Sequence, residues 1–140
     1  MSLTLVAGLV VIVAAVAAVL GGGGTIRFGS RATSDFEAKL RPVDEDAVAL
    51  NARGKAEREG RSDGFSEFEA HVTGLELPDG AVVEFVVADV VLGTATVKGA
   101  RTRLEFDSRL GQTVPPVEAG MVLEVRHKGK VLLAGQFYRD

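Results

Sequence analysis

The pattern of hydrophobic and polar positions divides the chain into two unlike parts. Between residues 3 and 20 no side chain is charged, and only Thr4 and Gly8 interrupt a run of Leu, Val, Ile and Ala. As a helix, this segment would span roughly 27 Å, close to the ~30 Å hydrocarbon core of a bilayer. The rest of the chain is too short to surround a helix that is apolar on every side. The pattern therefore predicts a transmembrane helix that ends at the glycine joint 21–24.

A period of two replaces this pattern after Gly54. In residues 67–72 and 101–107, polar side chains alternate with apolar ones, as in strands that have one face in water. Gly and Pro residues recur between the short apolar segments and mark turns. The pattern predicts an antiparallel β-sandwich of about seven strands over residues 54–140.

The second half of the chain contains an internal repeat. The segment 80–85, Gly-Ala-Val-Val-Glu-Phe, aligns with the segment 120–125, Gly-Met-Val-Leu-Glu-Val, forty residues later. Two copies are too few for a solenoid, so we expect two related hairpins within one sandwich. The predicted hairpins join strand 82–87 to 90–97 and strand 121–127 to 130–138.

Residues 25–53 predict a short tether between the two parts. Ser34 and Glu37 have the spacing of a capping box, which predicts that a helix begins there. Pro42 cannot continue a helix, so we expect this helix to extend through about Leu40.

The acidic triplet 44–46 favours a second short helical turn over residues 47–50. The predicted fold class is therefore mainly β: one N-terminal transmembrane helix, a short helical tether and an antiparallel β-sandwich. The expected parts are residues 1–24 for the helix and glycine joint, 25–53 for the tether and 54–140 for the sandwich.

The first predicted hairpin has apolar side chains on both faces, whereas the second carries a polar set on its outer face. Either the tether or another protein must therefore cover one face of the first hairpin. In the apolar N-terminal segment, two alanines four residues apart could seat a neighbouring helix. The predicted partner-docking residues are Ala14, Ala18, Val82, Val86, Val90 and Leu92.

Composition excludes several function classes. The net charge of -3 and the pI near 5.4 give no electrostatic basis for binding nucleic acid. Without Cys the chain has no disulfide, thiolate metal site or cysteine nucleophile. The two histidines, His71 and His127, are expected to be solvated. Because no residues have the spacing of a catalytic or cofactor site, we expect a protein that is not an enzyme and binds no metal or cofactor.

The segment 68–80, Phe-Glu-Ala-His-Val-Thr-Gly-Leu-Glu-Leu-Pro-Asp-Gly, contains a strand, a Gly-Leu pair and a Pro-x-Gly turn. It resembles a passage of the copper–zinc superoxide dismutases and of the related CHRD sandwich domains. The resemblance implies a Greek-key sandwich, and in the dismutases a cluster of histidines that binds copper and zinc. This chain has only His71 and His127, and no His-x-His follows the turn, so the resemblance implies the fold without the metal site.

The side of the membrane on which the sandwich lies has two opposing indications. Arg27 and Arg31 follow the apolar segment and no charged side chain precedes it, which favours the cytoplasm. Sandwiches of this kind are common outside the cytoplasm, and we expect an extracytoplasmic (periplasmic) domain at the cell membrane. A cleaved signal peptide, with Ala15 and Ala17 in an A-x-A site, is the alternative to an anchor.

Together these features predict a single-pass membrane-anchored protein that acts as a structural or accessory subunit of a larger membrane protein complex. The expected partners are the lipid bilayer and other membrane protein subunits, with no nucleic acid. One alternative is a pilin-like filament subunit. Another is a membrane-anchored module that binds a ligand or glycan through charged side chains. Candidates for that site are Arg101, Arg103, Glu105 and Arg126.

Overall fold

The computed structural model describes residues 35–140, and the regular secondary structure in this part of the chain is almost entirely β-strand. Two single-turn 3-10 helices, η2 (Ala47–Ala49) and η3 (Ser108–Leu110), interrupt the strands. The strands are β1 (Phe36–Pro42), β2 (Arg53–Gly60), β3 (Ser66–Thr73), β4 (Val82–Val87), β5 (Val90–Thr96), β6 (Arg101–Asp107), β7 (Val122–His127), β8 (Lys130–Gln136) and β9 (Tyr138–Arg139).

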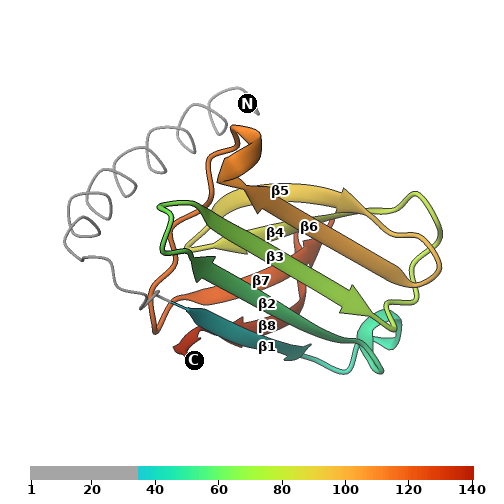
Figure 1. Ribbon diagram of the computed structural model, residues 1–140. Coiled ribbons are helices and arrows are strands. Elements are labelled where there is room, and N and C mark those ends of the chain that lie inside the picture. Colours follow the sequence, from blue (N-terminus) through green and yellow to red (C-terminus); the bar gives the residue numbers. More distant parts are fainter. Residues whose placement is uncertain (1–34) are drawn as a thin grey trace.

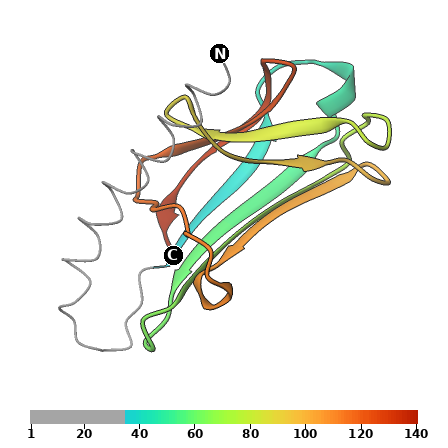
Figure 2. The same ribbon diagram turned by 90° about the horizontal axis from the view of Figure 1, so that it is seen from above.

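The strands form two antiparallel layers that cover each other (Figures 1 and 2). The front sheet has the order β1-β2-β3-β6, and the back sheet has the order β5-β4-β7-β8. The strands of the back sheet cross those of the front sheet at a large angle (Figure 1). The layers are joined through β1 and β8 at one edge. At the other edge, within the described residues, the turn bridge Lys98↔Arg101 lies where β5 leads into β6.

Alternation along each strand places the apolar side chains between the layers. The alanines Ala38, Ala56 and Ala70 lie opposite one another across three strands of the front sheet, so the back sheet can approach closely. Larger side chains fill the remaining space, and the Phe68 ring packs against those of Phe106 and Phe137 at centroid distances of 6.2 and 6.4 Å. Burying each such ring contributes about 2–3 kcal/mol, which makes this the core of the domain.

The seam between the two sheets depends on a close approach of two backbones. The end of β1 pairs with β8 through Arg41↔Ala134, whereas its beginning pairs with β9 through Phe36↔Arg139. A Cβ atom at Gly135 would overlap the carbonyl oxygen of Lys39 and lie 2.8 Å from its carbon. Only glycine fits at this position, where the chain leaves the back sheet to run along the front sheet.

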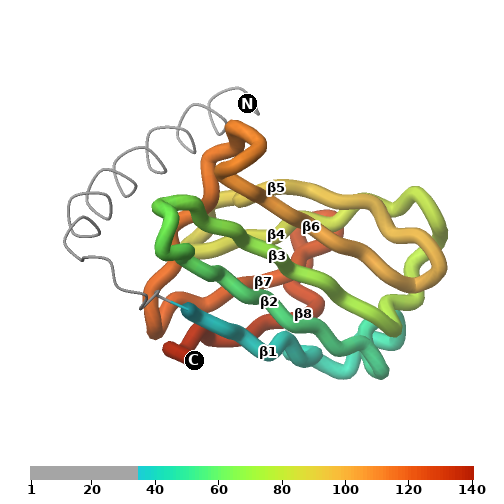
Figure 3. The backbone as a smooth tube through the Cα atoms, viewed as in Figure 1, coloured from blue at the N-terminus to red at the C-terminus, as the bar shows by residue number. Residues whose placement is uncertain are grey.

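The predicted internal repeat is present as two equivalent hairpins, β4–β5 and β7–β8. Gly80 N–H donates to the carbonyl of Val97 at 2.8 Å, and Gly120 N–H donates to that of Phe137 at 2.9 Å, at the same offset of forty residues. The ladder between β4 and β7 pairs Phe85 with Val125, which is its own counterpart in the repeat. The register of this ladder therefore relates the two hairpins by a local twofold axis in the middle of the back sheet. Figure 3 traces both hairpins behind the strands of the front sheet.

The predicted helical tether is wrong, because the segment assigned to a helix through Leu40 is strand β1. Buried Phe36, Ala38 and Leu40 alternate with polar residues, of which Lys39 and Arg41 are exposed and Glu37 is buried, and this alternation suits a strand. Pairing with β2 on one side and with β8 and β9 on the other overrides the local capping signal. The second turn is confirmed as η2, where the Asp46 side chain caps the Val48 N–H at 3.1 Å.

The predicted fold class is therefore wrong in its helical tether, whereas its mainly β character is confirmed. Within the described residues the sheet has nine strands, and it begins at Phe36 and not near residue 54. Within residues 35–140 no helix has the length and apolar character needed to cross a membrane. The transmembrane helix predicted over 1–24, with Ala14 and Ala18, lies outside the described residues.

Candidate functional site

The predicted docking residues of the first hairpin do not form one surface. Val82, at the start of β4, is 50% exposed, and Val90 is half-buried next to the hairpin turn. Leu92 packs against the core. A bulge in the ladder opposite Phe85 and Val86 leaves Leu92 without a partner across the strands and allows this inward position.

Val86 is buried although it lies outside the core cluster. It pairs across the ladder with Glu124, on the outer face of the back sheet. Arg126 binds Glu124 through Nε at 2.9 Å and reaches Asp89 through Nη2 at 2.8 Å. Hydrogen bonds to Asp89 and then to Glu124 raise the pKa of Arg126. Val86 thus lies between Val91 on β5 and Glu124 on β7, so charged side chains interrupt the apolar surface that the sequence pattern suggests on this face.

The outer face of the front sheet has a different organisation, because charges of one sign lie next to each other across neighbouring strands. Lys39 lies opposite Lys55, which lies opposite His71, which lies opposite Arg103. In the adjacent row, Arg53 and Arg101 lie on either side of Thr73. We call these side chains the basic band; its members are Lys39, Arg53, Lys55, His71, Arg101 and Arg103.

Carboxylates occupy the other half of the same face. One row across the four strands consists of Glu37, Glu57, Glu69 and Glu105, and the next consists of Glu59, Glu67 and Asp107. We call these seven side chains the acidic band. Rows are two residues apart along each strand, so the centres of the two bands are separated by roughly 13 Å.

Ion pairs join the bands at their boundary. Lys55 Nζ lies 3.4 Å from Glu57 and 3.7 Å from Glu37, and the Glu57 carboxylate followed by that of Glu37 raises the pKa of Lys55. Arg103 Nη2 lies 2.8 Å from Glu69 and 2.7 Å from Glu105. The rest of the basic band has no such partner: within the described residues Lys39, Arg53 and Arg101 make no ion pair.

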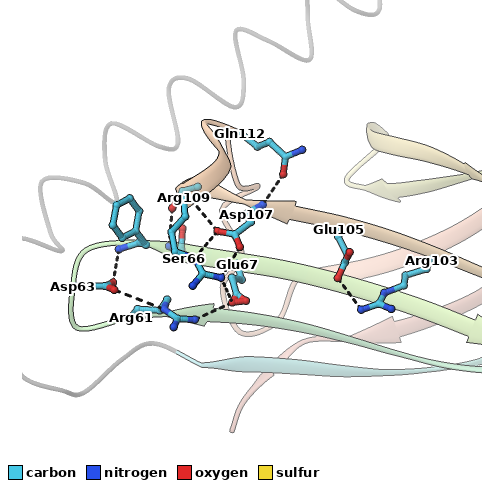
Figure 4. A network of polar contacts seen from close by, with 11 residues as sticks. Arg61, Asp63, Ser66, Glu67, Arg103, Glu105, Asp107, Arg109 and Gln112 are labelled. Carbon is cyan, nitrogen blue, oxygen red and sulfur yellow. Dashed lines mark hydrogen bonds and ion pairs between the residues drawn. The ribbon is translucent and has the colours of Figure 1, made fainter.

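The far end of the acidic band is partly neutralised (Figure 4). Arg61 Nη1 donates to Glu67 at 2.9 Å, and Arg109 Nη2 donates to Asp107 at 2.7 Å. Hydrogen bonds from Arg109 lower the pKa of Asp107. Burial, followed by neighbouring carboxylates, raises the pKa of Glu59, which has no ion-pair partner in the described part of the chain.

A shallow depression of about 550 Å³ lies at the basic band, between β3, β6 and the end of β5. It is wide open to solvent, so it suits contact with another surface better than enclosure of a small molecule. Its charged and polar lining consists of Glu69, His71, Thr73, Thr96, Arg101, Thr102 and Arg103.

Of the charged residues predicted for a ligand site, the structure brings together Arg101, Arg103 and Glu105 on β6. Arg126 lies on the back sheet, away from them. Within residues 35–140 no group of three or more His, Asp or Glu side chains could hold a metal ion.

Sequence reasoning missed the two bands, although a signal for them exists. The outward-facing charges are basic and then acidic along β2 and β6, and acidic and then basic along β1 and β3. Neighbouring strands of the front sheet run in opposite directions, so this reversal brings equal signs side by side. Recognising the pattern required the strand order, which the sequence did not supply. No protein-family model matches the chain, and a search of curated proteins finds no significant match.

Proposed function

We propose that this chain is a membrane-anchored accessory protein without catalytic activity, whose sandwich docks on other protein subunits through the charged face of the front sheet. The observation that carries the proposal is the separation of the two signs into bands. Like charges directly opposite each other destabilise a sheet by a few tenths of a kcal/mol to about 1 kcal/mol per pair. An alternating arrangement of the same residues would avoid this loss, so stability alone does not account for the bands.

The geometry also suits docking. The charges extend from four paired strands, so their relative positions are fixed before a partner arrives. Within residues 35–140, Lys39, Arg53 and Arg101 hold no ion pair that binding a carboxylate of another protein would break. Such complementary charges give an interface orientation and a fast, salt-dependent association.

Membrane attachment in this proposal rests on the apolar composition of residues 3–20. It is tested by washing native membranes at high pH, which removes peripheral proteins, and by protease treatment of sealed cells. The chain should stay with the membranes, and protease should reach an extracytoplasmic sandwich. Release of the chain by the wash would refute the anchor, and protection from protease would place the sandwich in the cytoplasm.

The docking function is tested by extracting the native protein in mild detergent and identifying the proteins that co-migrate with it. We expect a heteromeric assembly at low salt that loses the chain at high salt, because screening shortens the reach of exposed charges. Arg101→Glu should weaken the co-migration. Lys128→Glu makes the same charge change on the exposed turn of the β7–β8 hairpin and should not weaken it. A chain that migrates without other proteins would refute the accessory role.

A second candidate function is binding of an anionic ligand, such as an acidic glycan, in the depression beside Arg101 and His71. The depression itself favours this candidate. Against it, two carboxylates already hold Arg103 at 2.7 and 2.8 Å. Titration of the purified chain with an acidic oligosaccharide distinguishes the two, because docking through the whole face predicts no saturable binding of a short anion.

A further inference from the structure

Along β1, β2 and β6 the two bands of the front sheet are mirror counterparts in charge, whereas on β3 the uncharged Thr73 lies opposite Glu67 about the boundary. On β2, the order Arg53, Lys55, Glu57, Glu59 has opposite signs at equal distances from the boundary between Lys55 and Glu57. On β6, the order Arg101, Arg103, Glu105, Asp107 has the same property. On β1, Lys39 and Glu37 flank the boundary in the same way.

This arrangement makes the face complementary to itself. Consider a twofold axis that lies in the plane of the face, perpendicular to the strands, along the boundary between the bands. Rotation by 180° about this axis generates a second copy whose basic band covers the acidic band of the first. It would place Arg53 of one copy over Glu59 of another, and Lys55 over Glu57. On β6 it would place Arg101 over Asp107. An interface between identical copies with a twofold axis has this form, in which one patch meets itself.

We propose that the front sheet docks face to face on the front sheet of a second copy of this chain, with the basic band of each copy on the acidic band of the other. The inference rests on the proposed function, since it names one partner for the same docking face. In the resulting dimer each front-sheet strand lies over the same strand of the second copy, and the two run in opposite directions. Glu59, which has no ion-pair partner within the described chain, would gain one in Arg53 of the second copy.

The size of the face fits a weak and reversible dimer. Four strands of seven or eight residues present roughly 20 Å by 25 Å of surface. Contact over most of it would bury on the order of 1,000 Å² in total, the lower end for specific interfaces. Both sheets are twisted, so the central strands β2 and β3 would meet most closely. Exposed ion pairs each contribute little, so the dimer should be sensitive to salt.

A membrane surface is the less favoured occupant of the basic band. The described chain begins at Asp35, whose carbonyl accepts a hydrogen bond from Asp140 at 3.0 Å beside the start of β1. The sandwich therefore connects to the residues that precede it at the end of the face that carries the acidic band. Anionic lipid headgroups would repel that end, and the basic band lies farther along the strands.

The proposal is tested on the full chain in mild detergent, by measuring self-association through chemical crosslinking and mass determination at low and high salt. Two charge-reversed variants are compared: R53E/K55E, which makes the β2 part of the face acidic, and E57K/E59K, which makes it basic. Each alone should lose at least tenfold in dimer affinity, because the altered side chains then face like charges. Mixed in equal amounts, the two variants should recover dimer formation as a heterodimer.

The mixture separates an interface from a folding defect, because two misfolded chains would not restore each other. E76K/E118K, which reverses two exposed carboxylates outside the face, is the matched control and should dimerise like the natural chain. A chain that stays monomeric at 100 µM and low salt, or a mixture that fails to recover, would overturn the proposal. If the monomeric chain still co-migrates with other subunits, the accessory function stands and only the self-docking fails.

Discussion

Replacing Gly135 by Ala should open the seam between the two sheets. The backbone at this position is not in the left-handed region, so an alanine has no intrinsic conformational penalty there. Its Cβ would overlap the Lys39 carbonyl oxygen and lie 2.8 Å from the carbonyl carbon, and both atoms belong to the backbone of β1. No side-chain rotation can relieve the contact, so β1 and β8 must move apart by roughly 1 Å.

The loss of stability follows from what the seam contains. Parting the strands stretches the pairing at Arg41↔Ala134 and Pro42↔Leu133, together with the hydrogen bond from Val43 N–H to the Leu132 carbonyl at 3.2 Å. Two or three hydrogen bonds at about 1 kcal/mol each give about 2–3 kcal/mol. Looser packing beneath the seam adds about 1 kcal/mol. A total of about 3–4 kcal/mol should lower the Tm of a domain of this size by roughly 12–30 °C.

The measurement is thermal unfolding of the full chain in mild detergent, followed by far-UV circular dichroism. Gly129→Asn is the control, because Gly129 has a positive φ of 82°, which asparagine tolerates, and a Cβ there would meet no atom within 4 Å. The control should unfold within about 4 °C of the natural chain. If Gly135→Ala does the same, the close approach of β1 and β8 does not hold the sheets together.

Three further perturbations test other parts of the structure. Leu92→Asp should lower the free energy of unfolding by at least about 2 kcal/mol in urea titrations, because Leu92 packs against the core. Val82→Asp, on the exposed start of β4, should change it by less than about 0.5 kcal/mol. Equal losses would contradict the bulge that turns Leu92 inward. Lys128→Asn should raise the Tm by roughly 2–6 °C, because Lys128 has a φ of 51° in a turn that favours Asn-Gly. An unchanged or lower Tm would count against the left-handed conformation of Lys128. A hydrogen bond from Lys130 at 2.7 Å, and to a lesser extent one from Val48 N–H, lower the pKa of the Asp46 carboxyl below its ordinary 3.8. The stabilising effect of this carboxylate is therefore complete above about pH 4 and is lost as the pH falls through the lowered pKa. The Tm difference between the natural chain and Asp46→Asn should therefore shrink on acidification from neutral pH towards about pH 3, and a difference independent of pH would refute the ionic contribution.

Periodicity alone predicted most of the sandwich. The alternation in residues 67–72 and 101–107 appears as β3 and β6, and the forty-residue repeat appears as two hairpins with matching hydrogen bonds. The error at β1 has a physical origin. Glu37 offered a local capping pattern, while some of the partners that hold residues 36–42 in a strand lie more than a hundred positions away in the sequence.

The candidate site was less accessible to sequence reasoning. Val86 and Leu92 looked alike in the sequence. Only the register shift in the ladder distinguishes Val86, which pairs with Glu124 on the outer face, from Leu92, which packs against the core. The charge bands depend on which strands are neighbours, because Lys55 and Arg103 lie in one row only once β3 is placed between β2 and β6. Strand order is a property of the whole chain, and local patterns carry little information about it.

The pairing of the first strand with the last two has a consequence for synthesis on the ribosome. Until residues 133–139 have emerged, one edge of β1 has no partner, since Ala134, Leu133 and Arg139 supply its second set of pairing positions. A nascent chain would present this open edge to other unfolded chains while the rest of the front sheet assembles. Lys39, Arg41 and the closing Pro42 lie along it, and charged residues and proline are what discourage edge-to-edge aggregation. These side chains would therefore discourage aggregation of the chain before β8 and β9 have paired with β1.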